Sequence, residues 1–534
     1  MLKPLQLHHS DRGSGAQQDK NGGGSKGGEN GKGKFEHRKD QPPAYAPVSS
    51  RYDKNLQFAL WYPAILQDAK LIDTKYPAKG FFTHMPWSVR AMKRMYSLYE
   101  AELERTGHEP AWFPAVMPES LLKKEAEHLE GFNPQVFWIT QIGSSTLPKG
   151  ERLALRPTSE TIMYTVYSNW INGLADLPLK IYQSCQVWRA EDETKAFIRG
   201  REFYWIEAHD VFATMKEAEQ QVMADIAMSE KVIHGQFGIP MLFVKRPAWD
   251  TFPGAEYTYA ADTLLPDGKA LQLPSTHLLG QKFSTKFDIK FTNSDGKEEY
   301  AYQTCYGPSI WRIFGALVAV HADERGLRFP FEVAPQQVVI IPIKAKTAED
   351  DARVAQKCNE LKEQLEKAGI RAIIDDSDKK PGFKYNHWEL MGVPVRIELG
   401  AREAAGGNVT LVSRTEPGKI TVSEDKLEAA IRDMGKRLNE TLTAEADKTF
   451  NDSFITCMTI EEMRENKAHR GFFRIPYCSI ANDGGECFDR LKQEFEVAVR
   501  GTKVGEDEKP PEGCMCVGGC GREAGMMVYA AKRY

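Results

Sequence analysis

The fold of this chain is decided by the stretch LRPTSET (155–161), CQVWRAE (185–191) and IRGREFYWIEAHDVF (198–212). Two strand-like apolar runs, Lys180–Val187 and Glu202–Ile206, hold charged groups that a purely structural strand would exclude. The polar segment Ala190–Gly200 joins them. We therefore predict an antiparallel hairpin whose mobile, positively charged loop suits a phosphate chain or an RNA end.

Three side chains on the second strand indicate a pocket. Trp205, Glu207 and His209 alternate at period two, so all three project to one side of the strand. Taken singly, a charged pair such as Arg189 with Glu191 is more simply explained as a surface ion pair. An aromatic ring, a carboxylate and an imidazole on one face are costly in a core and reasonable in a binding pocket.

Length and composition indicate a soluble protein of several domains. A chain of 534 residues is too long for one core, and we expect three or four domains. Hydrophobic residues make up 41% and aromatic residues 10%, as in ordinary globular proteins. No apolar run approaches about 18 residues, and the N-terminus lacks the apolar stretch of a signal peptide. We expect a cytoplasmic protein with no membrane segment.

We predict four parts along the chain: residues 1–48, 49–335, 336–446 and 447–534. The first is rich in glycine and lysine and is predicted to be disordered. Within it, Gly28, Gly33 and Lys34 approach a phosphate-binding loop, but Phe35 stands where a hydroxyl is required. This run is therefore interpreted as part of a solvated tail.

The second part is predicted to be an α+β domain with an antiparallel sheet. Pro86–Thr106 has the apolar spacing of an amphipathic helix, and the strand Pro110–Pro118 after it is either a core element or a dimer contact. A helix (Lys216–His234) and a largely apolar helix (Ile313–Val320) are also predicted. The remaining strands are Met241–Lys245, Tyr257–Thr263, Lys269–Leu273, Phe287–Thr292 and Tyr300–Thr304. Runs of strands with few helices between them favour antiparallel pairing.

After Pro335 strands and helices alternate, which predicts a compact α/β domain. Its strands are Val338–Ile343, Ile370–Asp375, Val395–Leu399 and Val409–Ser413, and its helices Ala348–Ala368 and Glu424–Leu442. The run Lys379–Trp388 is predicted to be a loop whose lysines and aromatic rings suit unstacked RNA bases, or equally an ordinary surface loop. The formal net charge of −4 neither supports nor excludes RNA.

The last part contains a cluster of cysteines: Cys478, Cys487, Cys514, Cys516 and Cys520. Four thiolates from two separated groups fit a closed zinc site, although the gap from Cys478 to Cys487 exceeds the usual spacing. Free thiols are the alternative. Four of these five would bind, and which two of Cys514, Cys516 and Cys520 do so stays open. Such a site leaves no position for substrate, so Zn²⁺ would be structural.

A set of segments, taken together, resembles the prolyl-tRNA synthetase family of the archaeal and eukaryotic type. The segments are Arg156–Thr161, Val187–Glu191, Arg201–His209, Thr276–Gly280, Gly307–Arg312 and Asn386–Leu390. They occur in the family's order, and the resemblance runs from about Tyr52 to Tyr534. It implies a class II synthetase catalytic domain, an α/β anticodon-binding domain, a small zinc-binding C-terminal domain and a homodimer that meets through Pro86–Pro118.

The resemblance also implies the reaction. The enzyme would activate L-proline with ATP to prolyl-adenylate, with Mg²⁺ bridging phosphates, and transfer the prolyl group to the 3′ end of tRNA(Pro). The catalytic residues would be Arg189 and Arg312. The proline site would comprise Thr158, Glu160, Phe203, Trp205, Glu207, His209 and His277. The ATP site would comprise Arg189, Glu191, Arg201, Gln272, Ser275, Thr276 and Arg312.

Two alternative functions stay open at this point. A sister class II enzyme for threonine, glycine or histidine would share the arginines, but Phe203 and Trp205 favour proline. A non-catalytic RNA-binding protein would have no reason to keep a desolvated charge such as Glu160. Relatives usually carry Gly-Thr-Ser-His or Ala-Thr-Ser-His where this chain has Pro-Ser-Thr-His (274–277), so either Ser275 or Thr276 would contact ATP.

Overall fold

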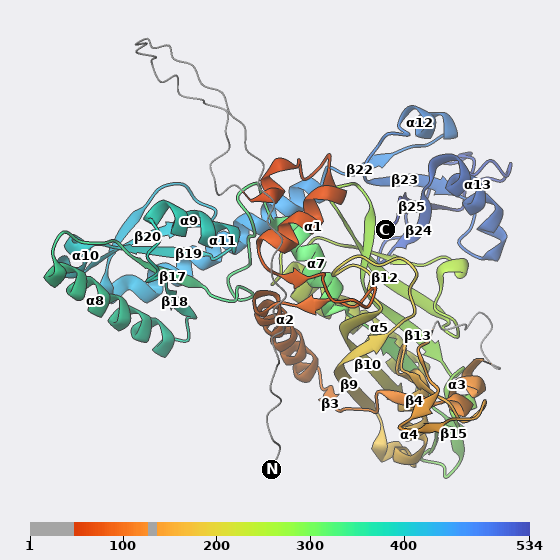
Figure 1. The fold of residues 1–534 in the computed structure, drawn as a ribbon. Coiled ribbons are helices and arrows are strands. Elements are labelled where there is room, and N and C mark those ends of the chain that lie inside the picture. The colour runs from red at the N-terminus through yellow and green to blue at the C-terminus, as the bar shows by residue number, and fades with distance from the viewer. Residues whose placement is uncertain (1–46, 127–135) are drawn as a thin grey trace, which may run out of the picture. The chain divides into compact units, whose positions relative to one another are not determined.

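The structure is a computed structural model that describes residues 47–126 and 136–534 (Figure 1). The predicted tail, residues 1–48, lies outside the described residues except at Pro47 and Val48, and so does the run that approaches a phosphate-binding loop. Within the described ranges no helix is both long and apolar enough to cross a membrane.

The hairpin predicted from residues 155–212 is confirmed. β9 (Leu179–Trp188) pairs antiparallel with β10 (Glu202–Phe212), with Glu202 opposite Trp188 and Val211 opposite Leu179. β10 continues past the predicted end because Glu207 and His209, which hide the strand pattern in the sequence, are accommodated by buried partners.

The hairpin is part of an eleven-stranded sheet, ordered β22-β23-β25-β24-β11-β12-β13-β16-β10-β9-β3. From β24 to β9 every neighbouring pair is antiparallel, which confirms the predicted sheet. The other strands are β3 (Glu109–Pro110), β11 (Leu242–Lys245), β12 (Tyr257–Leu264), β13 (Ala270–Gly280), β16 (Tyr302–Tyr306), β22 (Phe454–Thr456), β23 (Phe472–Tyr477), β24 (Ala498–Lys503) and β25 (Met526–Ala531).

Four predicted strands differ from those observed, and one of them, Tyr300–Thr304, divides between β15 (Glu298–Tyr300) and β16. The run Pro110–Pro118 is not one strand: it divides into β3 and β4 (Val116–Pro118), since prolines lack the N–H that continuous pairing needs. The strand predicted from Phe287 begins only at Lys290, in β14 (Lys290–Thr292), because Ser284–Phe287 form the short helix α6. β13 runs on past the predicted Leu273 to Gly280.

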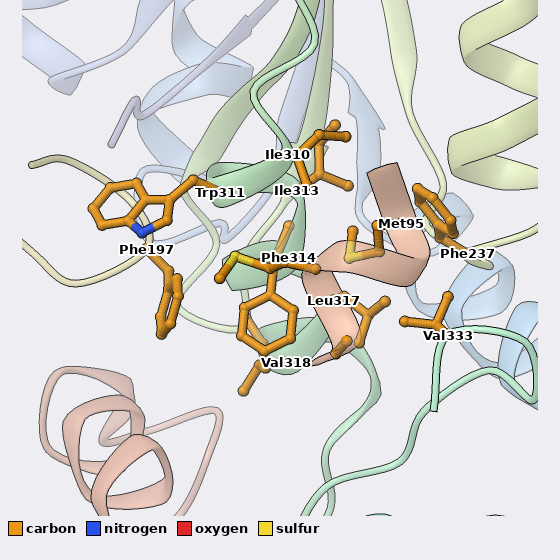
Figure 2. Packing of buried hydrophobic residues seen from close by; sticks show 14 of the residues in the cluster. Met95, Phe197, Phe237, Ile310, Trp311, Ile313, Phe314, Leu317, Val318 and Val333 are labelled. Atoms are coloured by element: carbon orange, nitrogen blue, oxygen red, sulfur yellow. The ribbon is translucent and has the colours of Figure 1, made fainter. Parts of the chain in front are cut away.

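The buried helix α7 (Ile310–His321) organises the largest hydrophobic core. Figure 2 shows its side chains packed with those of α2 (Pro86–Arg105) and of the β9–β10 connection: Met95, Phe197, Trp311, Phe314 and Leu317. The helix begins where the Ser309 hydroxyl accepts a hydrogen bond from the Arg312 N–H at 3.4 Å. Packing along its whole length therefore fixes the position of Arg312, which lies in its first turn.

The predicted α/β domain is confirmed as a five-stranded sheet, ordered β18-β17-β19-β20-β21. β17 pairs in parallel with β18 and β19, and β20 and β21 continue antiparallel. The strands are β17 (Val338–Pro342), β18 (Ala372–Ile374), β19 (Val395–Leu399), β20 (Asn408–Ser413) and β21 (Ile420–Ser423), and the long helices are α8 (Ala348–Lys367) and α11 (Leu427–Asn451).

The predicted loop Lys379–Trp388 is wrong. Residues Pro381–Leu390 form helix α9, with proline in its first turn, where its missing N–H costs nothing. Lys384 is buried and donates to the Asp375 carbonyl at 2.7 Å, and the Trp388 indole donates to the Asp375 carboxylate at 2.8 Å. Two of the side chains that suggested RNA contact therefore hold the helix in place instead.

The C-terminal segment is joined to the antiparallel strands of the preceding part by main-chain pairing. β24 pairs with β11, with Val244 opposite Lys503 and Lys245 opposite Thr502. The segment has its own core, formed with helix α13 (Gly485–Phe495). One sheet therefore connects the β9–β10 hairpin and its neighbours to the strands of the cysteine-containing segment (Figure 1).

Candidate active site

A cavity of about 550 Å³ opens beside the β9–β10 hairpin and brings most of the predicted site residues together. The predicted residues that line it are Thr158, Glu160, Arg189, Glu191, Phe203, Trp205, Glu207, Gln272, Ser275, His277 and Arg312. They come from the β9–β10 connection, β10, β13, the first turn of α4 (Glu160–Trp170) with the residues just before it, and the start of α7. Its volume suits a nucleotide and a small amino acid together.

Two guanidinium groups from distant parts of the chain face this one cavity. Arg189, just after β9, donates to the Pro157 carbonyl at 3.1 Å and lies over the Phe203 ring at 5.1 Å. Arg312 donates to the carbonyls of Ile198 and Gln272 at 3.1 and 3.2 Å. Burial and the charge of Arg189 lower the pKa of Arg312 to about 10. Two half-buried cations that face one cavity favour an anionic ligand between them.

The cavity is also lined by a buried carboxylate and by two aromatic rings. Glu160, in the first turn of α4, accepts hydrogen bonds from the Thr158 hydroxyl and from the Cys305 thiol, whose sulfur lies 3.4 Å from Oε1. It is 1% exposed. Phe203 and Trp205 stand edge to face, with ring centroids 5.7 Å apart. A carboxylate beside an apolar wall suits a small cation with an apolar body.

His209 lies behind the cavity and supports Glu207. Its Nε2 is 3.3 Å from Glu207 Oε2, and its Nδ1 is 2.9 Å from the Tyr164 hydroxyl. Burial alone would lower the pKa of His209, but the hydrogen bond and charge of Glu207, with that of Glu160, raise it above its ordinary value. Burial alone would raise the pKa of Glu207, and the contacts with His209 outweigh this and lower it. The two form a buried ion pair.

His277 is held as a neutral ring. Its Nδ1 lies 2.9 Å from the Thr258 hydroxyl, its Nε2 lies 3.1 Å from the Ser275 hydroxyl, and the Phe252 ring covers it at 4.8 Å. Burial lowers the pKa of His277 to about 3. It therefore offers hydrogen bonds and an aromatic face, not charge, to a ligand.

Two predicted ATP-site residues do not line the cavity. The Thr276 hydroxyl points through the sheet to Asp225, to which it donates at 2.7 Å. Arg201 donates to the Glu191 carbonyl at 2.8 Å, behind the cavity wall.

A buried polar cluster lies beneath the sheet. His108 Nε2 is 3.2 Å from Asp210, and Asp225 accepts from Gln221 at 2.7 Å. Burial and the Asp210 carboxylate raise the pKa of Asp225 to about 7. This cluster joins the α2–β3 connection, α5 (Met215–Ser229) and β10 rather than forming part of the cavity.

Sequence reasoning missed two features near the cavity. Residues 246–253, between β11 and β12, form one wall. Tyr534 stands beside the β9–β10 loop, with the Lys195 ammonium 4.7 Å from its ring, and its N–H donates to the Ala270 carbonyl at 3.1 Å. No local pattern reveals either, because both depend on contacts between residues far apart in the chain.

Four cysteines come together in the C-terminal segment: Cys478, Cys487, Cys516 and Cys520, whose sulfurs all lie within 4.8 Å of one another. Cys487 is 3.8 Å from both Cys478 and Cys516. The sulfurs of a tetrahedral zinc site with bonds of about 2.3 Å are separated by about 3.8 Å. Cys514 lies outside this group, with its sulfur near the Met458 carbonyl.

Comparison with known proteins identifies the class. The family model described as tRNA synthetase class II core domain (G, H, P, S and T) matches residues 142–321, and the one described as Anticodon binding domain matches residues 337–434. With the antiparallel sheet and the arginine-lined cavity, these matches define a class II aminoacyl-tRNA synthetase.

Individual relatives narrow the class to one amino acid. The chain is 47% identical to the proline–tRNA ligase of Thermofilum pendens over 483 residues, 90% of this chain and 98% of that protein. It is 38% identical to that of Methanopyrus kandleri over 92% of this chain and 99% of that protein. The solved structure of Giardia lamblia prolyl-tRNA synthetase in complex with prolyl-adenylate matches with a TM-score of 0.84 at 35% identity, covering 89% of this chain and 98% of that one.

The chain belongs to the proline–tRNA ligase family. It is an enzyme that activates proline with ATP and charges tRNA, as the sequence resemblance implies.

Proposed function

We propose that the cavity binds proline and ATP side by side and forms prolyl-adenylate there. An oxygen of the proline carboxylate attacks the α-phosphorus of ATP, the bond from that phosphorus to the bridging oxygen breaks, and pyrophosphate leaves. Because the nucleophile and its target are both anionic, cations have to neutralise the developing charge. Arg189 and Arg312, half-buried and without an ion-pair partner among the described residues, supply it.

Proline binds at the end of the cavity that holds Glu160. The carboxylate of Glu160, with the Thr158 hydroxyl, receives the cationic imino group. Phe203, Trp205 and His277 surround the ring. Glu207 closes the base of the pocket, and His209 keeps Glu207 ionised and in place.

ATP binds at the arginine end. Arg189 contacts the α-phosphate, and Arg312 contacts the γ-phosphate and adenine from the other side. Glu191, Gln272 and Ser275 line the same space, and Glu191 offers a carboxylate ligand for the Mg²⁺ that ATP carries. Mg²⁺ bound with ATP would withdraw charge from the leaving group. Arg201 and Thr276, which lie behind the wall, contribute to ATP binding only by holding their neighbours.

The second step transfers the prolyl group to the terminal ribose of tRNA. The α/β domain at residues 336–446 binds the anticodon, and two copies of the chain meet through Pro86–Pro118. We propose a cytoplasmic homodimer with tRNA(Pro), L-proline and ATP as its ligands.

The four gathered cysteines hold a structural Zn²⁺. The donor set fits, because the sulfur–sulfur distances of 3.8 Å are those of a tetrahedral site. Zinc bound to four thiolates carries a net negative charge, and Arg522, which donates to Cys478 with a nitrogen–sulfur distance of 3.1 Å, compensates part of it. Bound zinc would tie β23 to α13.

The convergence of Arg189 and Arg312 on one cavity beside Glu160 carries this proposal. Pyrophosphate exchange with ATP, measured with each amino acid in turn, tests it. Proline alone should support rapid exchange, and Arg312→Ala should abolish it. Equal exchange with threonine, glycine or histidine would refute the assignment.

A further inference from the structure

One wall of the cavity is a loop that the mechanism above does not use. Between β11 and β12 this loop contributes Arg246, Trp249, Asp250, Thr251, Phe252 and Pro253 to the lining. It directly follows β11, the strand that pairs with β24 of the C-terminal segment. The wall of the active site is thus a neighbour of the segment that holds the cysteine cluster.

Two contacts hold the middle of this loop against the C-terminal segment. The Ala248 N–H donates to the Ile480 carbonyl at 2.8 Å. The Trp249 ring packs on the Phe488 ring with centroids 5.5 Å apart. Both partners belong to the C-terminal core, so the loop takes its shape from residues more than two hundred positions away in the sequence.

A buried charged triad provides a second attachment. Asp262 on β12 accepts two hydrogen bonds from Arg246, at 2.8 and 2.9 Å, and two from Arg500 on β24, both at 2.8 Å. All three side chains are buried. Burial alone would raise the pKa of Asp262, but the two guanidinium groups outweigh it and hold the pKa well below its usual range. The ionised carboxylate of Asp262 therefore holds the side chains of Arg246 and Arg500 in place.

Arg246 lines the cavity itself and also connects the triad to Gln272. Arg246 donates to the Gln272 side-chain oxygen at 3.4 Å, and Gln272 lines the proposed ATP site. With its oxygen occupied by Arg246, the Gln272 amide presents its NH₂ group as a donor. A series of hydrogen bonds therefore connects Arg500, through Asp262 and Arg246, to Gln272.

The close approach of β24 that this series of hydrogen bonds requires is built into the chain. Gly501 has φ +127°, and a Cβ added there would lie 1.9 Å from the Lys245 carbonyl oxygen. Only glycine permits that approach. The residue beside Arg500 therefore lets the C-terminal strand come close enough for Arg500 to reach Asp262.

We infer that Arg500 is a positioning residue for the ATP end of the cavity, acting through Asp262 and Arg246 on Gln272 and, together with Ile480 and Phe488, on the wall formed by residues 246–253. The inference rests on the proposed function of the cavity. Groups held in place before ATP binds do not lose entropy when it binds, so loosening them weakens ATP binding.

The test compares Arg500→Gln with Arg474→Gln in the full-length chain. Arg474 forms an ion pair with Glu508 at 3.1 Å within the C-terminal segment and does not contact the 246–253 loop or Asp262. In proline-dependent pyrophosphate exchange, Arg500→Gln should raise KM for ATP about tenfold, the effect of about 1.4 kcal/mol. The KM for proline should change less, and Arg474→Gln should leave both unchanged.

Hydrogen exchange provides a second measurement, and Arg500→Lys provides a second variant. Hydrogen exchange of residues 246–253 should accelerate in Arg500→Gln and not in Arg474→Gln. If Arg500→Gln does not fold, Arg500→Lys keeps the charge but loses the two-pronged bond, and a smaller rise in KM for ATP is expected. An unchanged KM in the folded variants, or equal effects from Arg474→Gln, would overturn the inference. Loss of exchange in the unaltered chain would instead refute the proposed function, and the hydrogen-exchange comparison would still decide the role of Arg500.

Discussion

Ser275 and Thr276 are adjacent in β13, yet their hydroxyls lie on opposite faces of the sheet. Ser275 Oγ is 3.1 Å from His277 Nε2 at the cavity, whereas Thr276 Oγ1 donates to Asp225 at 2.7 Å beneath the sheet. Successive side chains of a strand point to opposite faces, so only the Ser275 hydroxyl faces the cavity. The sequence had left open which of the two residues contacts ATP.

Substituting each hydroxyl should therefore have a different effect. We expect Ser275→Ala to raise KM for ATP several-fold with little change in stability. Thr276→Val should leave KM unchanged and lower the free energy of unfolding by about 1–3 kcal/mol, since it leaves a buried acceptor unsatisfied. Exchange kinetics and chemical denaturation measure the two effects. A larger rise in KM from Thr276→Val than from Ser275→Ala would contradict this division.

Glu160→Gln should weaken proline binding selectively. Replacing the carboxylate removes a charge-assisted hydrogen bond worth about 1.5–3 kcal/mol, so KM for proline should rise roughly ten- to a hundredfold. The KM for ATP should change little. Glu217→Gln is the matched control, because Glu217 caps the start of α5 on the surface. An equal rise in KM for proline and in KM for ATP would show that Glu160 is not specific to proline binding.

Asp225 should give the stability of the protein a pH dependence. Its pKa rises from 3.8 in the unfolded chain to about 7 in the fold, so the native state binds this proton more tightly. The stabilisation is complete below the lower value and is lost as pH rises towards the upper one. Asp225→Asn cannot ionise and should flatten the unfolding free energy between these two pH values. Urea denaturation across that range, with exposed Asp295→Asn as control, measures it; unaltered slopes would refute the assignment.

Cys514 and Cys516 provide a matched pair for the metal site. Cys516 lies in the four-cysteine group and Cys514 does not. After dialysis, Cys516→Ser should have lost its zinc and should melt at a lower temperature, whereas Cys514→Ser should retain about one zinc per chain. Elemental analysis with thermal unfolding checks both. Zinc loss from Cys514→Ser alone would show that the wrong cysteine has been assigned.

Local sequence patterns predicted the elements whose periodicity is strong. The β9–β10 hairpin and the alternating elements after Pro335 follow directly from spacing. Helix α9 was missed because its lysines and rings resemble a polar loop, while Lys384 and Trp388 in fact turn inward to Asp375. Propensity alone cannot reveal such a tertiary contact.

The candidate site was predictable only where chemistry and position coincide in one short run. Glu160, Arg189 and Trp205 belong to such runs, and all three line the cavity. Arg246 and Arg500 do not belong to such runs. Their arrangement depends on hydrogen bonds to Asp262, which lies on β12. Likewise, spacing could not separate Cys514 from Cys516, since only the folded structure shows which of the two sulfurs joins the other three cysteines.

The pairing of β11 with β24 also has a consequence for synthesis of the protein on the ribosome. The strand containing Val244 emerges long before the strand containing Lys503. Until then its backbone edge is uncovered, and uncovered edges recruit other strands. A nascent or prematurely terminated polypeptide that lacks β24 would therefore be prone to aggregate, and this risk ends only when translation has passed β24.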